Sequence, residues 1–468
     1  MNLRNSGLAH AREAAPRLRA PTISTALSGF SAALAMLVVS ACSGSSAFEP
    51  LPSRVPAAQT VAFVNASVLP MDGSVPLVRD QTVLVRDGLI VAVGTANQVT
   101  TPPDAVVIDA RGRFLMPGMI DAHTHIRFAR DLTLYAAYGV TTVITLGQSP
   151  TAEAMQARGS IARGESVGSR VFAAIFLDGP GGIQNVIPDT AGVRAAVRNA
   201  RQTGHEIVKA YNRLTADQFA VAVDEARNQN MPVIGHAVRS VPLEFAIKNG
   251  QHVVAHAEEY LYSFFRDQQN DARIPEAARF SKAAGVYVIP NLSAYTLIAE
   301  QWGNPSWLNR FDQQPEFQRL HPGWQSAWRN SSYVQRAGSL GTAPQFLARL
   351  TRALADSGVA LMTGTDSPVI PGLYPGESLA YDMETMVAAG ISPLMALQAA
   401  TRNGGNWLQQ MQLVNEPLGR IVAGTRADLL LLDRNPLDQV GNVRSVAGVM
   451  LNGAWYAAQA LDSLLQSP

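Results

Sequence analysis

Two histidines, His123 and His125, stand one residue apart at the end of the apolar run 114–122. Side chains at positions i and i+2 of a strand share a face, so both imidazoles are expected to point into the same space. Neutral imidazole is a good ligand for zinc and similar divalent ions. The pair therefore predicts half of a metal site, although a solvated strand end carries the same pattern.

Further polar residues follow apolar runs downstream. Lys209 ends the run 206–210, and Asp366 follows the run 361–364. Between positions 209 and 366, His236 and His256 each end a further apolar run. Each residue alone is more often a satisfied core histidine or a solvated charge. If the strands are parallel, however, their carboxyl ends meet at one mouth, where such residues would form a single site.

The elements that must position these residues alternate between short apolar strands and helical stretches. This alternation is typical of parallel βα units and predicts an α/β fold with a (β/α)8 TIM barrel. The expected strands are 118–123, 140–146, 171–177, 206–210, 233–236, 253–256, 286–290 and 360–364.

Both ends of the chain differ from this pattern. Short alternating runs broken by Asp72-Gly73 and Asp87-Gly88 indicate hairpins, and similar runs return near the C-terminus. We expect residues 60–115 and 416–468 to form one small β-sandwich that flanks a barrel at 116–415. The segment 293–347 contains four tryptophans, and it is interpreted either as a lid or as a helical decoration packed on the barrel.

The N-terminal segment has the features of a targeting sequence. Four arginines precede a largely apolar stretch at 23–39, and small residues then lead to Cys42, the only cysteine of the chain. The pattern resembles the lipobox of bacterial lipoproteins, whereas the alternative is a buried thiol. We predict a signal peptide at 1–41 and a lipidated flexible tether at 42–59. The protein would then be exported and lipid-anchored to the bacterial cell envelope.

Composition narrows the classes of partner. Lys plus Arg total 37 and Asp plus Glu total 36, so no excess of positive charge indicates nucleic-acid binding. After Cys42 no stretch of about 20 apolar residues is present, so membrane contact is expected only through a lipid anchor. The sequence leaves the oligomeric state open, a homo-oligomer included.

The ordered motifs resemble those of the amidohydrolase superfamily. The run 116–125 is similar to its metal-binding opening, and the similarity continues at 139–143, 364–366, 391–401 and 424–429. The resemblance covers about residues 60–456. It is greatest to the branch that contains imidazolonepropionase-like proteins and the lysine-bridged dipeptidases that act on Xaa-Pro or Xaa-Arg bonds.

This resemblance implies a role for each candidate ligand. His123, His125 and Asp366 would hold one zinc-like divalent ion, and His236 and His256 would hold a second. Lys209 would be carboxylated by carbon dioxide, and its carbamate would bridge the two ions. A hydroxide between the ions would attack the substrate carbonyl, and Asp366 would act as the base that passes the proton to the leaving nitrogen.

The residues expected to face the substrate depart from the family pattern. Many relatives have Glu-His-Gly after the sixth strand, whereas this chain has Ala-His-Ala-Glu-Glu-Tyr at 255–260. Arg239 is either a ligand for a substrate carboxylate or a solvated arginine. Tyr211 and Tyr260 either donate to the substrate carbonyl or form part of the rim.

Three functions follow, in order of preference. The first is hydrolysis of amide or peptide bonds in small substrates such as dipeptides or N-acyl amino acids. The second is another reaction at the same metal site, namely hydrolysis of a cyclic amide, a lactone or an ester, or a deamination. The third is a non-catalytic surface lipoprotein that uses the barrel for binding.

Overall fold

The computed structural model describes residues 51–147 and 150–466. The predicted signal peptide, Cys42 and the first part of the predicted tether lie outside these residues. Within the described part, none of the helices combines the length and the apolar character needed to cross a membrane.

Seven parallel strands form the central sheet, and they follow one another in chain order. Helices connect them, as parallel strands require a crossover between neighbours. The strands are β7 (Met119–Thr124), β8 (Val140–Thr145), β9 (Arg170–Leu177), β10 (Ile207–Ala210), β11 (Val233–Gly235), β12 (Gln251–Ala255) and β13 (Tyr287–Ile289).

An eighth segment, 360–367, closes this sheet into a barrel although it is not a regular strand. On one side, Val288 of β13 donates its backbone N–H to Ala360 O at 3.1 Å. On the other side, Ala122 of β7 donates to Thr363 O at 2.9 Å. The predicted (β/α)8 fold class is therefore confirmed, with the eighth strand reduced to isolated bridges with its neighbours.

One apolar cluster fills the inside of the barrel. Every barrel strand and the eighth segment contribute to it, for example Ile120, Phe172, Ile234 and Met362. Strands that lie across the barrel from one another can contribute to the same cluster only through the barrel interior. Trp407 of α13 (Arg402–Gln410) joins the same cluster, so this helix helps to close the barrel.

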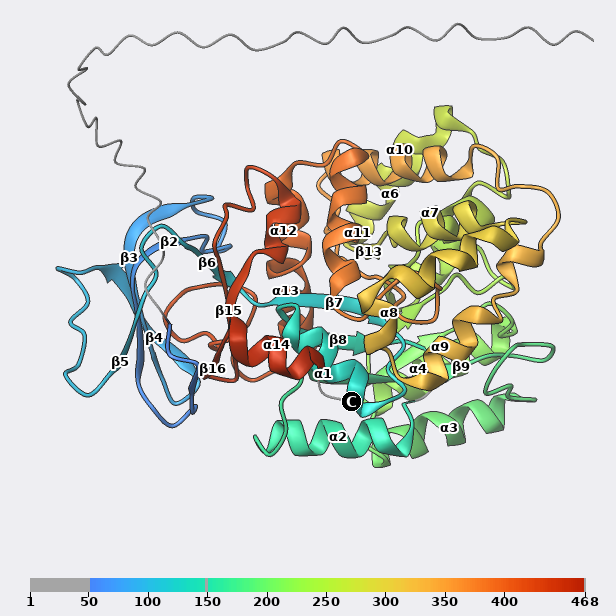
Figure 1. Cartoon of the computed structure of the whole chain (residues 1–468). Helices are drawn as coiled ribbons and strands as arrows, with labels where there is room; N and C mark the ends of the chain where they lie inside the picture. The colour runs from blue at the N-terminus through green and yellow to red at the C-terminus, as the bar shows by residue number, and fades with distance from the viewer. Residues whose placement is uncertain (1–50, 148–149, 467–468) are drawn as a thin grey trace, which may run out of the picture. The chain divides into compact units, whose positions relative to one another are not determined.

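Helices cover the outside of the barrel (Figure 1). Their apolar faces pack on the strands in two further clusters, one of which contains α3 and α4. The remaining α-helices of the barrel region are α1 (Ala129–Ala137), α2 (Ala152–Ala162), α3 (Thr190–Gln202), α4 (Ala216–Asn228), α5 (Leu243–Lys248), α6 (Ile274–Ala284), α7 (Leu292–Gln301), α8 (Pro315–Arg319), α9 (Pro322–Arg329), α10 (Ala343–Asp356), α11 (Glu377–Ala388) and α12 (Pro393–Ala399).

The two ends of the chain form a second sheet of nine strands with a shared apolar core. β6 pairs with β14 and β1 pairs with β16, which brings the blue and red ends of the chain side by side (Figure 1). The strands are β1 (Arg54–Val55), β2 (Val61–Val68), β3 (Val78–Arg86), β4 (Leu89–Thr95), β5 (Val106–Asp109), β6 (Phe114–Pro117), β14 (Leu429–Leu432), β15 (Val446–Leu451) and β16 (Ala454–Ala457), followed by α14 (Ala458–Gln466).

Part of the predicted tether belongs to this sheet. Val55 of β1 pairs with Trp455 and is only 2% exposed. Burial of this side chain in the core of the sheet holds the segment in place. Residues 54–55 are thus an ordered strand, where composition alone indicated a flexible linker.

The tryptophan-rich segment forms a packed helical excursion between β13 and the eighth segment. Trp307, Trp324 and Trp328 are buried in an aromatic cluster that also contains Leu134 of α1. The indole N–H of Trp324 lies 3.2 Å from both carboxylate oxygens of Asp131, a buried residue of α1. These contacts fit a decoration packed on the barrel.

Candidate metal centre

The predicted ligands lie at the carboxyl ends of five of the eight barrel elements. His123 is the last residue but one of β7, and Lys209 is in β10. His236 and His256 directly follow β11 and β12. Asp366 belongs to the eighth segment, and its backbone N–H donates to His123 O at 2.8 Å. The barrel therefore brings together residues that are up to 243 positions apart, from 123 to 366.

Three of these side chains form a compact set of ligand atoms. Asp366 Oδ1 lies 2.7 Å from Nε2 of His125 and 3.2 Å from Nε2 of His123. One ligand atom from each residue lies within 4.8 Å of the other two, which is the spacing needed to hold one metal ion. The two imidazoles are nearly parallel, with ring planes 12° apart, as expected for side chains on one face.

The other two histidines continue this cluster. The ring of His256 lies 4.5 Å from that of His123 and 4.6 Å from that of His236, measured between centroids. The four imidazoles thus surround a common space.

Lys209 lies in the middle of the imidazoles. Its Nζ is 3.2 Å from Nε2 of His123, and the residue is only 1% exposed. Among the described residues no carboxylate lies within ion-pair distance of this amine. A buried ammonium with no carboxylate in direct contact is costly, so burial disfavours the charged lysine more than the charges of Asp366 and Glu259 favour it.

Burial sets the protonation of these groups. It lowers the pKa of His123 and His236 well below the usual range and that of His256 to about 3. The charge of Lys209 lowers each pKa further, and the charge of Asp366 opposes this. These three imidazoles are therefore neutral, which is the form that binds metal ions. Burial also lowers the pKa of Lys209 to about 8.

A buried carboxylate, Glu259, orients one of the ligands. Its Oε1 lies 2.8 Å from Nδ1 of His236, and its Oε2 accepts from the backbone N–H of Ala237 at 3.2 Å. Arg239 completes the group with an ion pair of 2.8 Å to the same carboxylate. Partners of this kind fix the ring orientation of metal-binding histidines. The sequence showed Glu259 only as part of a departure from the family pattern.

The eighth segment is held tightly against β7. Buried Asp121 accepts hydrogen bonds from the N–H of His123 at 3.1 Å and from the hydroxyl of Thr365 at 2.6 Å. A Cβ on Gly364 would lie 2.8 Å from His123 Cβ, so this close approach requires glycine. Asp366 itself has φ +63°, a left-handed conformation that is uncommon outside glycine and recurs at functional sites.

The predicted substrate residues fall into different places. The ring of Tyr211 lies 4.2 Å from that of His236, so Tyr211 is part of the site. Arg239 donates to Glu259 and to Ser263 Oγ. Tyr260 does not reach the site, because its hydroxyl is bonded to Ser281 at 2.7 Å inside the core.

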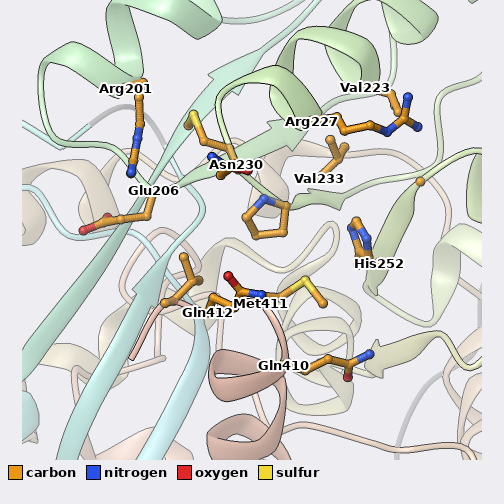
Figure 2. Close-up of a pocket in the computed structure, with 14 residues that line it drawn as sticks. Arg201, Glu206, Val223, Arg227, Asn230, Val233, His252, Gln410, Met411 and Gln412 are labelled. Atoms are coloured by element: carbon orange, nitrogen blue, oxygen red, sulfur yellow. The ribbon is translucent and has the colours of Figure 1, made fainter. Parts of the chain in front are cut away.

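A separate cavity of about 700 Å³ lies at the opposite end of the barrel (Figure 2). Pro232 and Gly250, which precede β11 and β12, line it together with residues 410–413 after α13. None of the predicted metal ligands lines this cavity. Its size therefore gives no reason to place the chemistry there.

The comparison with protein families agrees with the geometry. Residues 114–456 match the amidohydrolase family, and the chain belongs to this family. The assignment drawn from the sequence motifs is confirmed. The family is one of metal-dependent hydrolases that act on carbon–nitrogen bonds.

Several proteins are similar in sequence. The imidazolonepropionase of Idiomarina loihiensis is 39% identical over 71 residues, which are 15% of this chain and 17% of that protein. The imidazolonepropionase of Rubrobacter xylanophilus is 24% identical over 401 residues, or 77% of this chain and 86% of that protein. For several of these relatives, the matched region spans less than a fifth of their length.

Solved structures show the same fold. A bottromycin amidohydrolase superposes with a TM-score of 0.68 and 24% identity, covering 88% of this chain and 89% of that chain. A Xaa-Pro dipeptidase with bound methionine gives 0.66 and 19%, covering 85% and 100%.

Proposed function

We propose that the protein is a metal-dependent amidohydrolase that cleaves an amide or peptide bond in a small substrate, of the dipeptide or N-acyl amino acid type. The observation that carries the proposal is the convergence of four imidazoles, one carboxylate and one buried lysine at the mouth of the barrel. A structural core has no use for such a set, because each buried polar group costs free energy.

The donor set fits two divalent ions, for which zinc is the first choice because imidazole nitrogens and carboxylate oxygens suit it. His123, His125 and Asp366 would hold one ion, and His236 and His256 the other. Bound ions would lower the pKa of a water molecule and polarise the substrate carbonyl.

Lys209 would serve as the bridge in a carboxylated form. Carboxylation requires the neutral amine, and a pKa of about 8 leaves roughly a tenth of the lysine neutral at pH 7. A free lysine with its ordinary pKa would be neutral far more rarely. The carbamate would also replace a buried cation by an anion among the metal ligands, which removes the electrostatic conflict.

The remaining steps belong to the side chains. Asp366 would accept the proton of the attacking water and pass it to the leaving nitrogen. Tyr211, beside His236, would donate to the substrate carbonyl. Glu259 and Arg239 would keep His236 in place.

A substrate screen tests the proposal directly. Metal-loaded protein would be incubated with dipeptides and N-acyl amino acids, and with cyclic amides, lactones and esters. We expect hydrolysis of one of the first two classes, its loss with a chelator and its return with zinc. Turnover restricted to the cyclic amides, lactones and esters would favour the alternative, and turnover that survives metal removal would overturn the proposal.

We also propose that the protein is exported and anchored by a lipid on Cys42, which lies outside the described residues. Support comes from the position of this single cysteine behind an apolar run and small residues. Cys42→Ala should release the protein from the membrane fraction, as measured by fractionation. Retention of the variant after a high-salt wash would contradict a lipid anchor.

A further inference from the structure

We propose that Asn291 and Trp328 are positioning residues that hold Asp366, the carboxylate among the predicted metal ligands, in the place where it can bind an ion. The proposal rests on the proposed function, because it takes Asp366 to be a metal ligand. The two residues come from outside the barrel strands: Asn291 lies between β13 and α7, and Trp328 lies in α9. The tryptophan-rich excursion, which carries Trp328, thereby becomes part of the support of the metal centre.

The eighth segment lacks the backbone support that the other seven strands have. A regular parallel strand is held by an even row of backbone hydrogen bonds, whereas this segment has only isolated bridges to β7 and β13. Asp366 also has the left-handed conformation described above, with φ +63°. A residue other than glycine keeps such a conformation only where its surroundings fix it. Side chains from neighbouring elements must therefore supply part of the support.

Asn291 holds the backbone two residues before Asp366. Its Nδ2 donates to Gly364 O at 2.6 Å, and the residue is fully buried. Its Oδ1 has no hydrogen-bond partner within the described part of the chain, and its own φ is +51°. Both features cost free energy. The bond to Gly364 is thus the one polar contact that this buried side chain makes.

Trp328 holds the backbone two residues after Asp366. Its indole N–H donates to Pro368 O at 2.7 Å, and its ring is buried in the aromatic cluster of the excursion. Tyr374, from the loop that follows the eighth segment, packs on this ring with centroids 4.9 Å apart. The excursion therefore holds the chain that leads away from Asp366 by a hydrogen bond and by ring packing.

The backbone between these two contacts is bonded directly to the histidine ligands. Asp366 N–H donates to His123 O at 2.8 Å, and His125 N–H donates to Ser367 O at 2.8 Å. A shift of this segment would therefore move the carboxylate of Asp366 relative to both imidazoles. A metal site tolerates changes of only about 0.2 Å in its ligand distances. Loss of either outer contact should consequently weaken the binding of the ion.

Hydrogen exchange in the metal-free protein tests whether the two side chains hold this segment. Asn291→Gly removes the amide and tolerates a left-handed backbone, whereas Trp328→Phe removes the indole N–H and keeps an aromatic ring. We expect the backbone amides of residues 362–369 to exchange about fivefold faster in each variant than in wild type, since one buried hydrogen bond is lost. Mass spectrometry of peptides from this region measures the rates.

Zinc affinity tests whether this support matters for the ligand. Competition with a chelator would measure the affinities in the folded proteins. We expect one ion to bind about tenfold more weakly in both variants, in the range seen when groups that support a ligand are changed. The ion assigned to His236 and His256 should keep its affinity. A purely structural contact would lower Tm and leave the zinc affinity of the folded protein unchanged.

Matched controls come from the same kinds of residue. Trp324→Phe removes an indole N–H from the same aromatic cluster, but this donor bonds to Asp131 and not to the eighth segment. Asn230→Gly changes an exposed asparagine with φ +53° that lines the cavity at the opposite end of the barrel. Both controls should keep wild-type exchange at 362–369 and wild-type zinc affinity.

Each outcome has one meaning for the proposal. Unchanged exchange in a variant would overturn the role of that residue, and so would faster exchange together with wild-type zinc affinity. An equal loss of zinc affinity in Trp324→Phe would assign the effect of Trp328 to packing of the cluster and overturn its role. A wild-type protein that binds no zinc would overturn the proposed function instead, and the exchange rates would still decide whether Asn291 and Trp328 hold the segment of Asp366.

Discussion

At the scale of single residues, Lys209 carries the largest consequence. If its carbamate bridges two ions, Lys209→Ala should lose at least one ion and most hydrolytic activity while the barrel stays folded. Acetate or propionate should restore part of both, because a small carboxylate can occupy the vacated position. The measurement is metal content and turnover with and without the acid.

Lys209→Arg is the matched control for this experiment. Guanidinium keeps its charge and cannot form a carbamate, so neither acid should restore activity in this variant. Wild-type metal content and turnover in Lys209→Ala would show that no lysine bridge exists. A centre with a single ion would then replace the binuclear proposal.

Gly147 makes a second prediction at this scale. It follows β8, and a Cβ at this position would lie 2.1 Å from Nδ1 of His125. Gly147→Ala should therefore displace this imidazole and weaken metal binding by about 10- to 100-fold, in the range seen when groups supporting a ligand are changed. Titration with a chelator measures the affinity. Gly159→Ala within α2 should leave it unchanged, and equal affinities in both variants would exclude this contact.

At the scale of elements, Glu225 links α3 and α4. Its carboxylate, 1% exposed, accepts from Arg198 at 2.8 Å and pairs with Arg194 at 3.1 Å. The hydrogen bond from Arg198 outweighs the opposing effect of burial and lowers the pKa of Glu225 to about 2. An acid with a lowered pKa stabilises the fold at neutral pH, and this contribution is lost as the pH falls from about 4.5 to 2.

Glu225→Gln should consequently lower the free energy of unfolding at pH 7 by about 1–2 kcal/mol, since hydrogen bonds to a charged group are lost. The difference from wild type should remain constant from pH 7 to 5 and shrink below pH 4. Thermal unfolding followed at several pH values gives this difference. A constant gap down to pH 2.5 would show that the ion pairs do not cause it.

Several positions of secondary-structure elements could be predicted from the sequence, and others could not. Strand ends with His123, Lys209 and His236 were predicted because apolar runs ending in polar residues are local signals. The eighth segment was also predicted, from Gly364 and Asp366 after an apolar run, although its backbone forms only isolated bridges. Tyr260 was expected to face the substrate, but it begins a π-helical turn and lies in the core with its hydroxyl bonded to Ser281, and the residue pattern gives no sign of this turn.

At the scale of the whole molecule, the chain ends meet in one sheet that continues directly into the barrel. The N–H of Gly118, between β6 and β7, donates to Asp428 O of the C-terminal part at 2.8 Å. The short alternating runs at both ends of the sequence indicated this pairing. Register and the role of Glu259 depend on packing between distant segments, which a single sequence does not specify.

Trp455 tests whether this sheet and the metal centre behave as independent units. Its ring is fully buried against Phe63, with centroids 5.4 Å apart, and its indole N–H donates to Pro52 O at 2.9 Å. Trp455→Ala should lower the free energy of unfolding by about 3–5 kcal/mol and lower Tm, because it leaves a cavity in a closed core.

Bound zinc should raise Tm in wild type, since a ligand of the native state stabilises it. The core around Trp455 contains none of the predicted ligands, so the zinc-induced rise should persist in Trp455→Ala and become smaller in His123→Ala, which removes a ligand of one ion. Calorimetry of the three proteins with and without zinc decides this, and a rise abolished by Trp455→Ala would show that the sheet fixes the geometry of the metal centre through β6 and β7.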